Sequence, residues 1–538
     1  MPSMRVHQRR DTPPSGFVKT GNAADDQPLT ISLAIKSQDF ATLEKKLYAV
    51  STPGQDEYGQ HLTKDEVEEL VAPSDESASA VKEWLTSHGL SPETASPSGN
   101  MLRVSLSVKQ ANELLDADYA TFQDTKSGRQ TVRTLSYSVP ASVQDHISFV
   151  HPTVQFPIYG SSSSQGVAKR QASNLVGRDV PASCADDFTP SCAQQFYGIP
   201  STPIKDTSKH IGAIGVNDQY ASEADLKLFM QKYRPDITSA PTLNLISVVG
   251  GVNNQSDPGV EGNFVTQWLA GTAPGAPIDY ISVGDQDDLF DALVDMTNAL
   301  LNQTNPPQVI DVSYALPEPF IDEPTASHIC QSLAQLGARG ITVVAGSGSR
   351  GVSGGQDEGQ CHVFNPEFPA TCPYVTTIGG TNGIPETAWN LSGGGFSIFF
   401  PIPSYQTADV AAYQKTIPSS YAGLYNTTGR GFPDISAMAQ ISDFYLSGEL
   451  TTPQYTNGGT IISSGIIALL NDELASAGKA PLGFLNPLIY ANKDAFTDVT
   501  SGDNPSCNTN GFSATTGWDA ITGLGSPVYS KLRTAVGL

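Results

Sequence analysis

The feature that most restricts the fold of this chain is an alternation of apolar runs and amphipathic segments after Ser183. The apolar runs include HIGAIGV, IDYISVG, PQVIDVSY and ITVVAGSG. Between them, hydrophobic residues recur at helical spacing, as from Asp288 to Leu301 and from Pro324 to Ala338. Strands that are apolar throughout, separated by helices, are typical of a mostly parallel sheet with both faces covered. The sequence therefore predicts an α/β domain over residues 183–538.

The part before this domain has a different pattern. After a short N-terminal arm (1–13), residues 14–156 contain the alternating segments LTISLAIK and MLRVSLS, which predict strands. Thr63 and Glu66 have the spacing of a capping box, so a helix is expected to begin there. Strands and helices mixed over this length predict a small α+β domain, with a βαβ-type arrangement. A Ser- and Gly-rich linker follows at 157–182, in which Lys169-Arg170 is either a cleavage site or simply a solvated pair.

Composition excludes some functions. The net charge is −24, from 54 acidic and 30 basic residues, which argues against nucleic-acid binding. No apolar run is long enough to span a bilayer, and the N-terminus lacks the apolar core of a signal peptide. The six cysteines have no metal-binding spacing, which favours disulfides, with Cys184 and Cys192 the most plausible local pair. The sequons at Asn254, Asn302, Asn390 and Asn426 favour a secreted glycoprotein.

Several phrases resemble the sedolisin family of serine-carboxyl peptidases, most closely the fungal secreted tripeptidyl-peptidases. In the larger domain the phrase is GGTIISSGIIALLND at 458–472, and before it STPGQDEYGQHLT and RTLSYSVP are similar to the family's activation prodomain. The resemblance implies a subtilisin-like α/β domain, a zymogen matured by removal of its prodomain, and peptides or proteins as substrates. It also implies the chain's own prodomain as a partner.

The resemblance assigns the catalytic positions, and three of the four depart from the family. The nucleophilic serine is expected in a phrase like GGTSAS, where this chain has Ile461, and the segment is shorter by about four residues, roughly one helical turn. The base is retained as Glu261, but the aspartate that orients it, four residues on, is replaced by Val265. The aspartate that assists the oxyanion is replaced by Ser349. The sequence therefore predicts an inactive or severely impaired peptidase homologue.

Two alternatives stay open at this stage. One is an active acid peptidase that uses shifted residues, with Ser463 or Ser464 approaching Glu261. A Ser-His-Asp triad is disfavoured, because His210 starts a core strand and His328 and His362 lie in no nucleophile motif. The other is a non-catalytic peptide-binding or decoy protein. Its cleft wall would be the segment from Ser392, where Gly393, Gly394 and Gly395 would let a peptide backbone approach.

A calcium site is implied by two C-terminal phrases, DVTSGDNPSC and NGFSATTGWDAITGLGSP, which resemble the metal loops of the family. The ligands carried over are the carboxylates of Asp498 and Asp519. Backbone oxygens are expected from Val499, Thr515 and Gly517. A set of hard oxygen ligands in a Gly-rich loop suits Ca²⁺.

Overall fold

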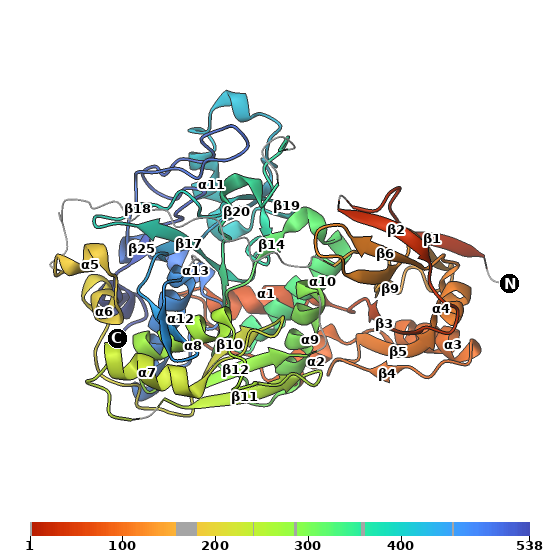
Figure 1. Ribbon diagram of the computed structural model, residues 1–538, viewed down its shortest axis with the longest axis horizontal. Coiled ribbons are helices and arrows are strands. Elements are labelled where there is room, and N and C mark those ends of the chain that lie inside the picture. The colour runs from red at the N-terminus through yellow and green to blue at the C-terminus, as the bar shows by residue number, and fades with distance from the viewer. Residues whose placement is uncertain are drawn as a thin grey trace.

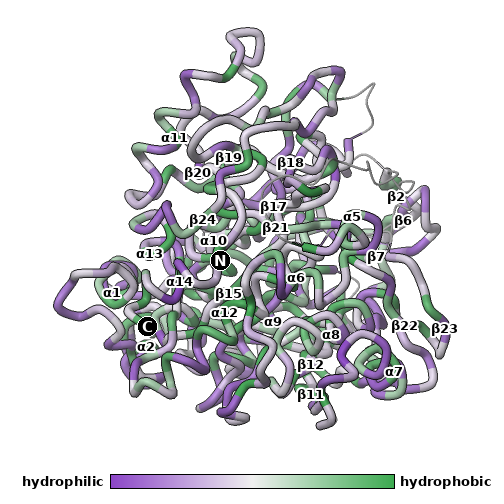
Figure 2. Tube along the Cα trace, turned by 90° about the vertical axis from the view of Figure 1, so that its left-hand side faces the viewer, coloured by the Kyte–Doolittle hydropathy of each residue, from purple (hydrophilic) through white to green (hydrophobic). Residues whose placement is uncertain are grey.

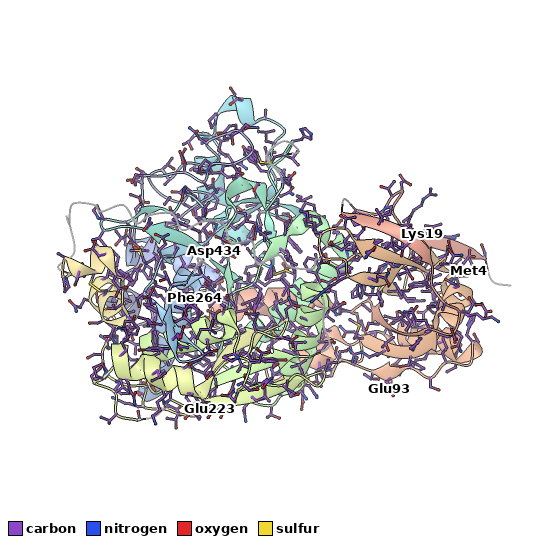
Figure 3. All side chains as sticks on the ribbon, in the orientation of Figure 1. Met4, Lys19, Glu93, Glu223, Phe264 and Asp434 are labelled. Carbon is purple, nitrogen blue, oxygen red and sulfur yellow. A yellow bond between two sulfur atoms is a disulfide. The ribbon has the colours of Figure 1, made fainter. Side chains whose placement is uncertain are left out.

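The computed structural model describes residues 3–14, 16–157, 180–239, 241–284, 288–356, 361–453 and 457–538. The predicted linker and its Lys169-Arg170 pair lie almost wholly outside these residues. Two parts are visible in Figure 1. The strands of residues 3–157 form the smaller part, while the helices over 40–51 and 64–71 lie against the larger part, which is built around a central sheet. Figure 3 places Met4, Lys19 and Glu93 on the smaller part, and Glu223, Phe264 and Asp434 in the larger part.

The larger part confirms the predicted parallel sheet. Its strand order is β11-β12-β10-β13-β15-β17, with β21 also paired to β17, and all of these pairings are parallel. Only the short β18, at one edge, pairs antiparallel to β17. The strands are β10 (Ile211–Gly215), β11 (Leu243–Val248), β12 (Ile278–Val283), β13 (Val309–Val312), β15 (Thr342–Gly346), β17 (Thr376–Asn382), β18 (Thr387–Ala388) and β21 (Ile435–Met438).

Helices cover both faces of this sheet, which explains why its strands are apolar throughout. One hydrophobic cluster joins alternate strand residues such as Ile211 and Ala213 to α8 and α12, and the other joins Ile214 and Ile310 to α9 and α10. In Figure 2 the hydrophobic segments concentrate toward the middle of the molecule. The helices are α5 (Ser183–Asp186), α6 (Pro190–Tyr197), α7 (Glu223–Tyr233), α8 (Val260–Thr272), α9 (Leu289–Asn302), α10 (Glu323–Ala338), α11 (Thr407–Tyr413), α12 (Gly458–Ser476), α13 (Asn486–Ala491) and α14 (Tyr529–Ala535).

Shorter strands complete this part of the chain: β14 (Leu316–Pro317), β16 (Glu367–Phe368), β19 (Gly395–Pro401), β20 (Gly429–Phe432), β22 (Phe444–Leu446), β23 (Glu449–Thr451), β24 (Phe496–Thr497) and β25 (Ser526–Pro527). Three disulfides are formed. The predicted local pair, Cys184–Cys192, is one of them, and the others are Cys330–Cys372 and Cys361–Cys507.

The smaller part is the predicted α+β domain, but its strand pairings differ from the expected βαβ type. Its main sheet has the order β4-β5-β3-β9, and each pairing is antiparallel. The N-terminal arm is also more ordered than predicted, because β1 pairs with β8. The elements are β1 (Met4–Arg9), β2 (Phe17–Asn22), β3 (Pro28–Ile35), α1 (Phe40–Ser51), α2 (Lys64–Val71), α3 (Asp75–Ser87), β4 (Glu93–Thr94), β5 (Met101–Ser107), α4 (Val108–Leu115), β6 (Ala120–Asp124), β7 (Gln130–Arg133), β8 (Ser136–Pro140) and β9 (Ile147–His151).

The two parts are joined by an extensive interface. Leu43 and Leu47 of α1 pack with Ala334 and Ala338 of α10 in one buried hydrophobic cluster. Polar contacts also join the two parts. Arg103 forms an ion pair of 2.6 Å with Asp295, His151 lies 2.9 Å from Asp291, and the Tyr374 hydroxyl donates to Glu44 at 2.6 Å. The predicted capping box is present, with Thr63 and Glu66 bonded reciprocally at the start of α2.

Candidate active site

Glu261 lies in the first turn of α8 and is held there by close packing of the backbone. The neighbouring Gly262 lies so near Gln219 that an added Cβ would be 2.4 Å from the Gln219 carbonyl oxygen, so a side chain would displace the helix. The Glu261 backbone N–H donates to the side chain of Gln219 at 3.1 Å. Glycine at this position therefore allows the helix start, and with it the Glu261 carboxyl group, to approach the rest of the site.

The carboxyl group of Glu261 accepts a hydrogen bond from the side-chain amide of Asn457. Burial and the nearby charge of Asp311 raise the pKa of Glu261 to about 8, although the Asn457 bond opposes this shift. A carboxyl group with such a pKa holds its proton throughout the acidic range. Glu261 is therefore a proton donor rather than an acceptor under acidic conditions.

Val265, at the expected position of the orienting aspartate, is 2% exposed and packs in the core with α8 and α12. Its isopropyl group cannot bond to a carboxyl group. A carboxyl group does occur nearby on another element, since Asp311 at the end of β13 influences Glu261. Asp311 accepts hydrogen bonds from Ser464 at 2.9 Å and from Ser313, and burial raises its pKa to about 6. Sequence reasoning missed Asp311. It could have been noticed as a charged residue within the strand predicted from PQVIDVSY.

The GGT phrase is not a turn before α12, as the sequence suggested, but the first turn of the helix itself. Gly458 and Gly459 pack against the backbone at the end of β21, where an added Cβ would lie 2.5 Å from the Ala439 carbonyl oxygen and 2.8 Å from that of Ala437, respectively. Ile461 is consequently inside the helix and fully buried. The shortened segment explains the difference, because no residues remain to form a separate turn that exposes the nucleophile position.

Neither alternative serine is hydrogen-bonded to Glu261 among the described residues. Ser464 is fully buried and donates to Asp311. The hydroxyl oxygen of Ser463 is buried and has no hydrogen-bond partner among the described residues. Asn457, which sequence reasoning also missed, takes the hydrogen-bonding position at Glu261 because it lies immediately before the displaced helix start.

Ser349 and Arg350, at the expected place of the oxyanion aspartate, follow β15 and are half-buried. Beneath them lies Glu367, whose Oε2 atom would be 2.2 Å from a Cβ added at Gly348. Burial raises the pKa of Glu367 to about 7, and the Arg350 charge opposes the shift. A protonated carboxyl group therefore adjoins this loop in acid, but it comes from β16 and not from the loop.

The three glycines of the predicted cleft wall lie against the chain's own backbone. A Cβ at Gly393 would be 1.9 Å from the Ser347 carbonyl oxygen, and one at Gly394 would be 2.0 Å from that of Ala520. Gly395 has a φ of +144° and faces Phe512. These close approaches explain the need for glycine through packing alone. A peptide-binding role for Gly393, Gly394 and Gly395 stays a prediction.

The predicted metal loops come together in space. Gly517 donates its backbone N–H to Asp498 at 2.8 Å, and Thr515 donates to Asp519 at 2.9 Å. Asp519 is fully buried and forms no ion pair with a described residue; burial raises its pKa to about 7 even though several N–H groups donate to it. Val499 lies beside it, with its carbonyl oxygen accepting from Thr522 at 3.3 Å. A buried carboxyl group without a countercharge fits a bound cation, although the described residues contain no cluster of three or more acidic, His or Cys side chains suited to a metal.

The histidines considered for a triad have other environments. His210 is hydrogen-bonded to Asp279 at 2.9 Å, at the edge of β10. His328 is buried within α10. Neither His328 nor His362 forms a hydrogen bond with a serine among the described residues. These positions do not form a triad.

Comparison with known proteins agrees with this architecture. Residues 15–156 match the family model "Pro-kumamolisin, activation domain". The chain is 31% identical to a probable tripeptidyl-peptidase SED2 of Trichophyton verrucosum and 32% identical to the tripeptidyl-peptidase SED2 of Arthroderma otae, in each case over 98% of this chain and 96% of the relative. The fold is similar to that of Pseudomonas sedolisin complexed with pseudo-iodotyrostatin, with a TM-score of 0.53 and 24% identity over 65% of this chain and 97% of that one. With a matching prodomain, full-length relatives and a shared fold, this chain belongs to the sedolisin family, in the group of its tripeptidyl-peptidase homologues.

Proposed function

We propose that this protein is a sedolisin-family homologue that keeps the fold and the prodomain but has lost, or nearly lost, peptidase activity. The observation that carries the proposal is the exchange of partners at Glu261. Its carboxyl group is engaged by the amide of Asn457, while Ile461, at the nucleophile position, is buried in α12. An amide nitrogen cannot replace the serine oxygen that attacks a peptide bond, because its lone pair is delocalised.

The electrostatics of the site support the same conclusion. A general base must be unprotonated at the working pH, but Glu261 has a pKa of about 8 and so keeps its proton in acid. In addition, Ser464 donates its hydroxyl to Asp311 rather than to Glu261. These contacts support the proposal that this site lacks both an exposed hydroxyl group and an unprotonated base within reach of it.

The test is a direct assay of the purified chain. We expect no turnover of an unblocked tripeptide substrate between pH 3 and 5 above the rate of the Glu261→Ala variant, since Glu261 has no nucleophile to activate. Thermal unfolding of both proteins confirms that each is folded in the assay. Turnover in the parent that disappears in both Glu261→Ala and Ser464→Ala would instead establish an active peptidase that uses shifted residues.

Calcium is the cofactor we propose for the C-terminal loops. The support is the buried Asp519, which has no countercharge among the described residues, in a loop that is joined to Asp498 by the Gly517 N–H and to the Val499 carbonyl oxygen through Thr522. When bound, the ion would stabilise the loops and take no part in peptide chemistry. The residues proposed to hold it are Asp498, Val499, Thr515, Gly517 and Asp519.

We also propose that the protein acts outside the cell, with peptides or proteins as its ligands. Three disulfides and the exposed positions of Asn254, Asn302 and Asn390 support secretion and glycosylation. Asn426 is a poorer glycan acceptor, since its amide donates to the Ser397 carbonyl oxygen at 2.9 Å. No helix in the described ranges has the length and hydropathy needed to cross a bilayer.

A further inference from the structure

The strand β11 (Leu243–Val248) forms an edge of the central parallel sheet. Figure 1 shows it at the bottom of the larger part, at the opposite end of the sheet from β17 and β18. Its inner neighbour is β12, and the two strands pair in parallel along their whole length without a shift of register. On its outer side, β11 pairs with no other strand of the described residues. This side can therefore accept a strand from another molecule.

The backbone groups of alternate residues in β11 point away from the sheet. Ile278 donates its N–H to the Thr242 carbonyl oxygen at 2.9 Å, and Gly284 donates to that of Val248 at 2.9 Å. In a parallel ladder, alternate residues bond to the inner neighbour, and the residues between them point their N–H and C=O groups outward. Thr242 and Val248 belong to the inward set. The outward set consists of Leu243, Leu245 and Ser247. The N–H and C=O groups of this set have no hydrogen-bond partner among the described residues.

The strand lacks the features that usually protect an exposed edge. Edge strands of soluble proteins carry charged residues, proline or a bulge, or are very short. β11 has no charged residue and no proline, and the sequence stays uncharged from Ile237 to Ser256. At the other end of the sheet, by contrast, β18 is only two residues long. The loop after β11 turns back toward β12, where Ser282 donates to the Val252 carbonyl oxygen at 2.7 Å, and so leaves the edge open.

Apolar side chains are exposed on and beside this edge. Leu245, in the middle of the outward set, is 47% exposed. In the loop that follows, Val249 is 44% exposed and Val252 is 53% exposed. Exposed apolar residues that gather on one part of the surface mark interaction sites. The unpaired backbone groups and the apolar side chains therefore both indicate that this edge binds a protein strand.

We propose that β11 is a self-association edge, at which a second copy of this chain pairs antiparallel through its own β11. A two-fold axis at Leu245 places the two Leu245 residues opposite each other and Leu243 opposite Ser247 of the second copy. Each outward residue then exchanges both of its backbone hydrogen bonds with the residue that faces it. The two Leu245 side chains lie on the same face of the joined sheet and contact each other across the axis.

Charge and symmetry favour a second copy over a basic partner. A basic segment would need carboxylates along the strand, and β11 has none. The residues on both sides of Leu245 are uncharged, so pairing about a two-fold axis brings no like charges together. The net charge of −24 makes two copies repel at a distance, so association should strengthen as salt screens this repulsion. The proposal does not depend on whether the peptidase site is active.

The experiment is sedimentation equilibrium of the full chain at pH 6, in low salt and in about 0.3 M sodium chloride. In the higher salt we expect a reversible monomer–dimer equilibrium with a dissociation constant of about 10–100 μM, as for a small, transient interface. Leu245→Lys places two ammonium groups on the axis and should weaken dimerisation more than about tenfold. The matched control is Leu450→Lys, at an exposed leucine of β23, which should dimerise as the parent does. Equal melting temperatures of the monomers confirm that both variants are folded.

Hydrogen exchange distinguishes strand pairing from contact through side chains alone. The inward amides of Asn244 and Ile246 bond to β12 and should exchange slowly at every protein concentration. The outward amides should change from fast to slow exchange as the dimer forms. A chain that stays monomeric up to about 500 μM overturns the proposal. So does a dimer that Leu245→Lys does not weaken, or a dimer in which the outward amides still exchange fast.

Discussion

Replacing Glu261 by glutamine should stabilise this protein near neutral pH, and the size of the effect follows from the site. Glutamine has the same shape and can still accept the hydrogen bond from Asn457, but it cannot ionise. In the folded protein the pKa of Glu261 is raised from 4.5 to about 8 by burial and by Asp311. The folded state therefore keeps a proton that the unfolded chain releases above pH 4.5, so in the parent stability falls as pH rises from about 4.5 to 8.

At pH 6, which is 1.5 units above the pKa of the unfolded glutamate, Glu261→Gln should raise the free energy of unfolding by about 2 kcal/mol, at about 1.36 kcal/mol per unit. At pH 4 both states are protonated, and the difference nearly vanishes. With an unfolding entropy of about 2.1 cal/mol/K per residue, a domain of this size should gain about 2–3 °C in melting temperature at pH 6.

The assay is differential scanning calorimetry of the parent and Glu261→Gln at pH 4 and pH 6. The exposed Glu449→Gln in the same domain serves as the control and should be neutral at both values. Equal melting temperatures for the parent and Glu261→Gln at pH 6, or a gain of the same size at pH 4, would refute the raised pKa. Either result would also mean that Glu261 can be unprotonated in acid and could act as a base.

Three further outcomes are expected. Chelation of calcium at pH 6 should lower the melting temperature of the parent but not that of Asp519→Ala. Because the Asp519 pKa is about 7, calcium must displace a proton below that pH, so the affinity of the protein for calcium should fall as pH drops. Ile461→Ser should give no peptidase activity and should destabilise the protein by more than about 3 kcal/mol, because it removes most of a buried aliphatic side chain and also buries a hydroxyl group. Ile461→Val should cost about 0.5–1.5 kcal/mol. Arg103→Met leaves the Asp295 carboxyl group without its cation at the interface, so by calorimetry the prodomain should unfold at a lower temperature and separately from the larger domain.

The sequence predicted the elements whose hydrophobic period is strong. The apolar runs became β10, β12, β13 and β15, and the helices at 288–301 and 324–338 lie within a residue of their predicted bounds. The strand β1 was not predicted, because MRVHQR alternates over only four residues and depends on its partner β8 for pairing. The end of α4 at Leu115 was not predicted either; there Asp116 adopts a left-handed conformation, with a φ of 44°.

At the candidate site, the sequence predicted which catalytic residues are replaced but not which residues contact Glu261. A catalytic position can be predicted from the motif around it in the chain, and the predictions for Val265, Ser349 and Ile461 were made in this way. The residues now closest to the retained carboxyl group come from other elements. Asp311 lies on β13 and Asn457 before α12, and their approach to Glu261 depends on tertiary packing that no local pattern records.

The shortened segment before α12 links these changes physically. Because Gly458 and Gly459 lie in the first turn of α12, no separate turn stands directly before the helix at these glycines. The helix buries Ile461 and carries Ser464 to Asp311, where its hydroxyl is bonded and not free. A hydroxyl substituted at position 461 would point into an apolar core and not toward Glu261. Under the proposed function, loss of the nucleophile would thus be a change of backbone path, which single side-chain substitutions at the predicted positions would not reverse.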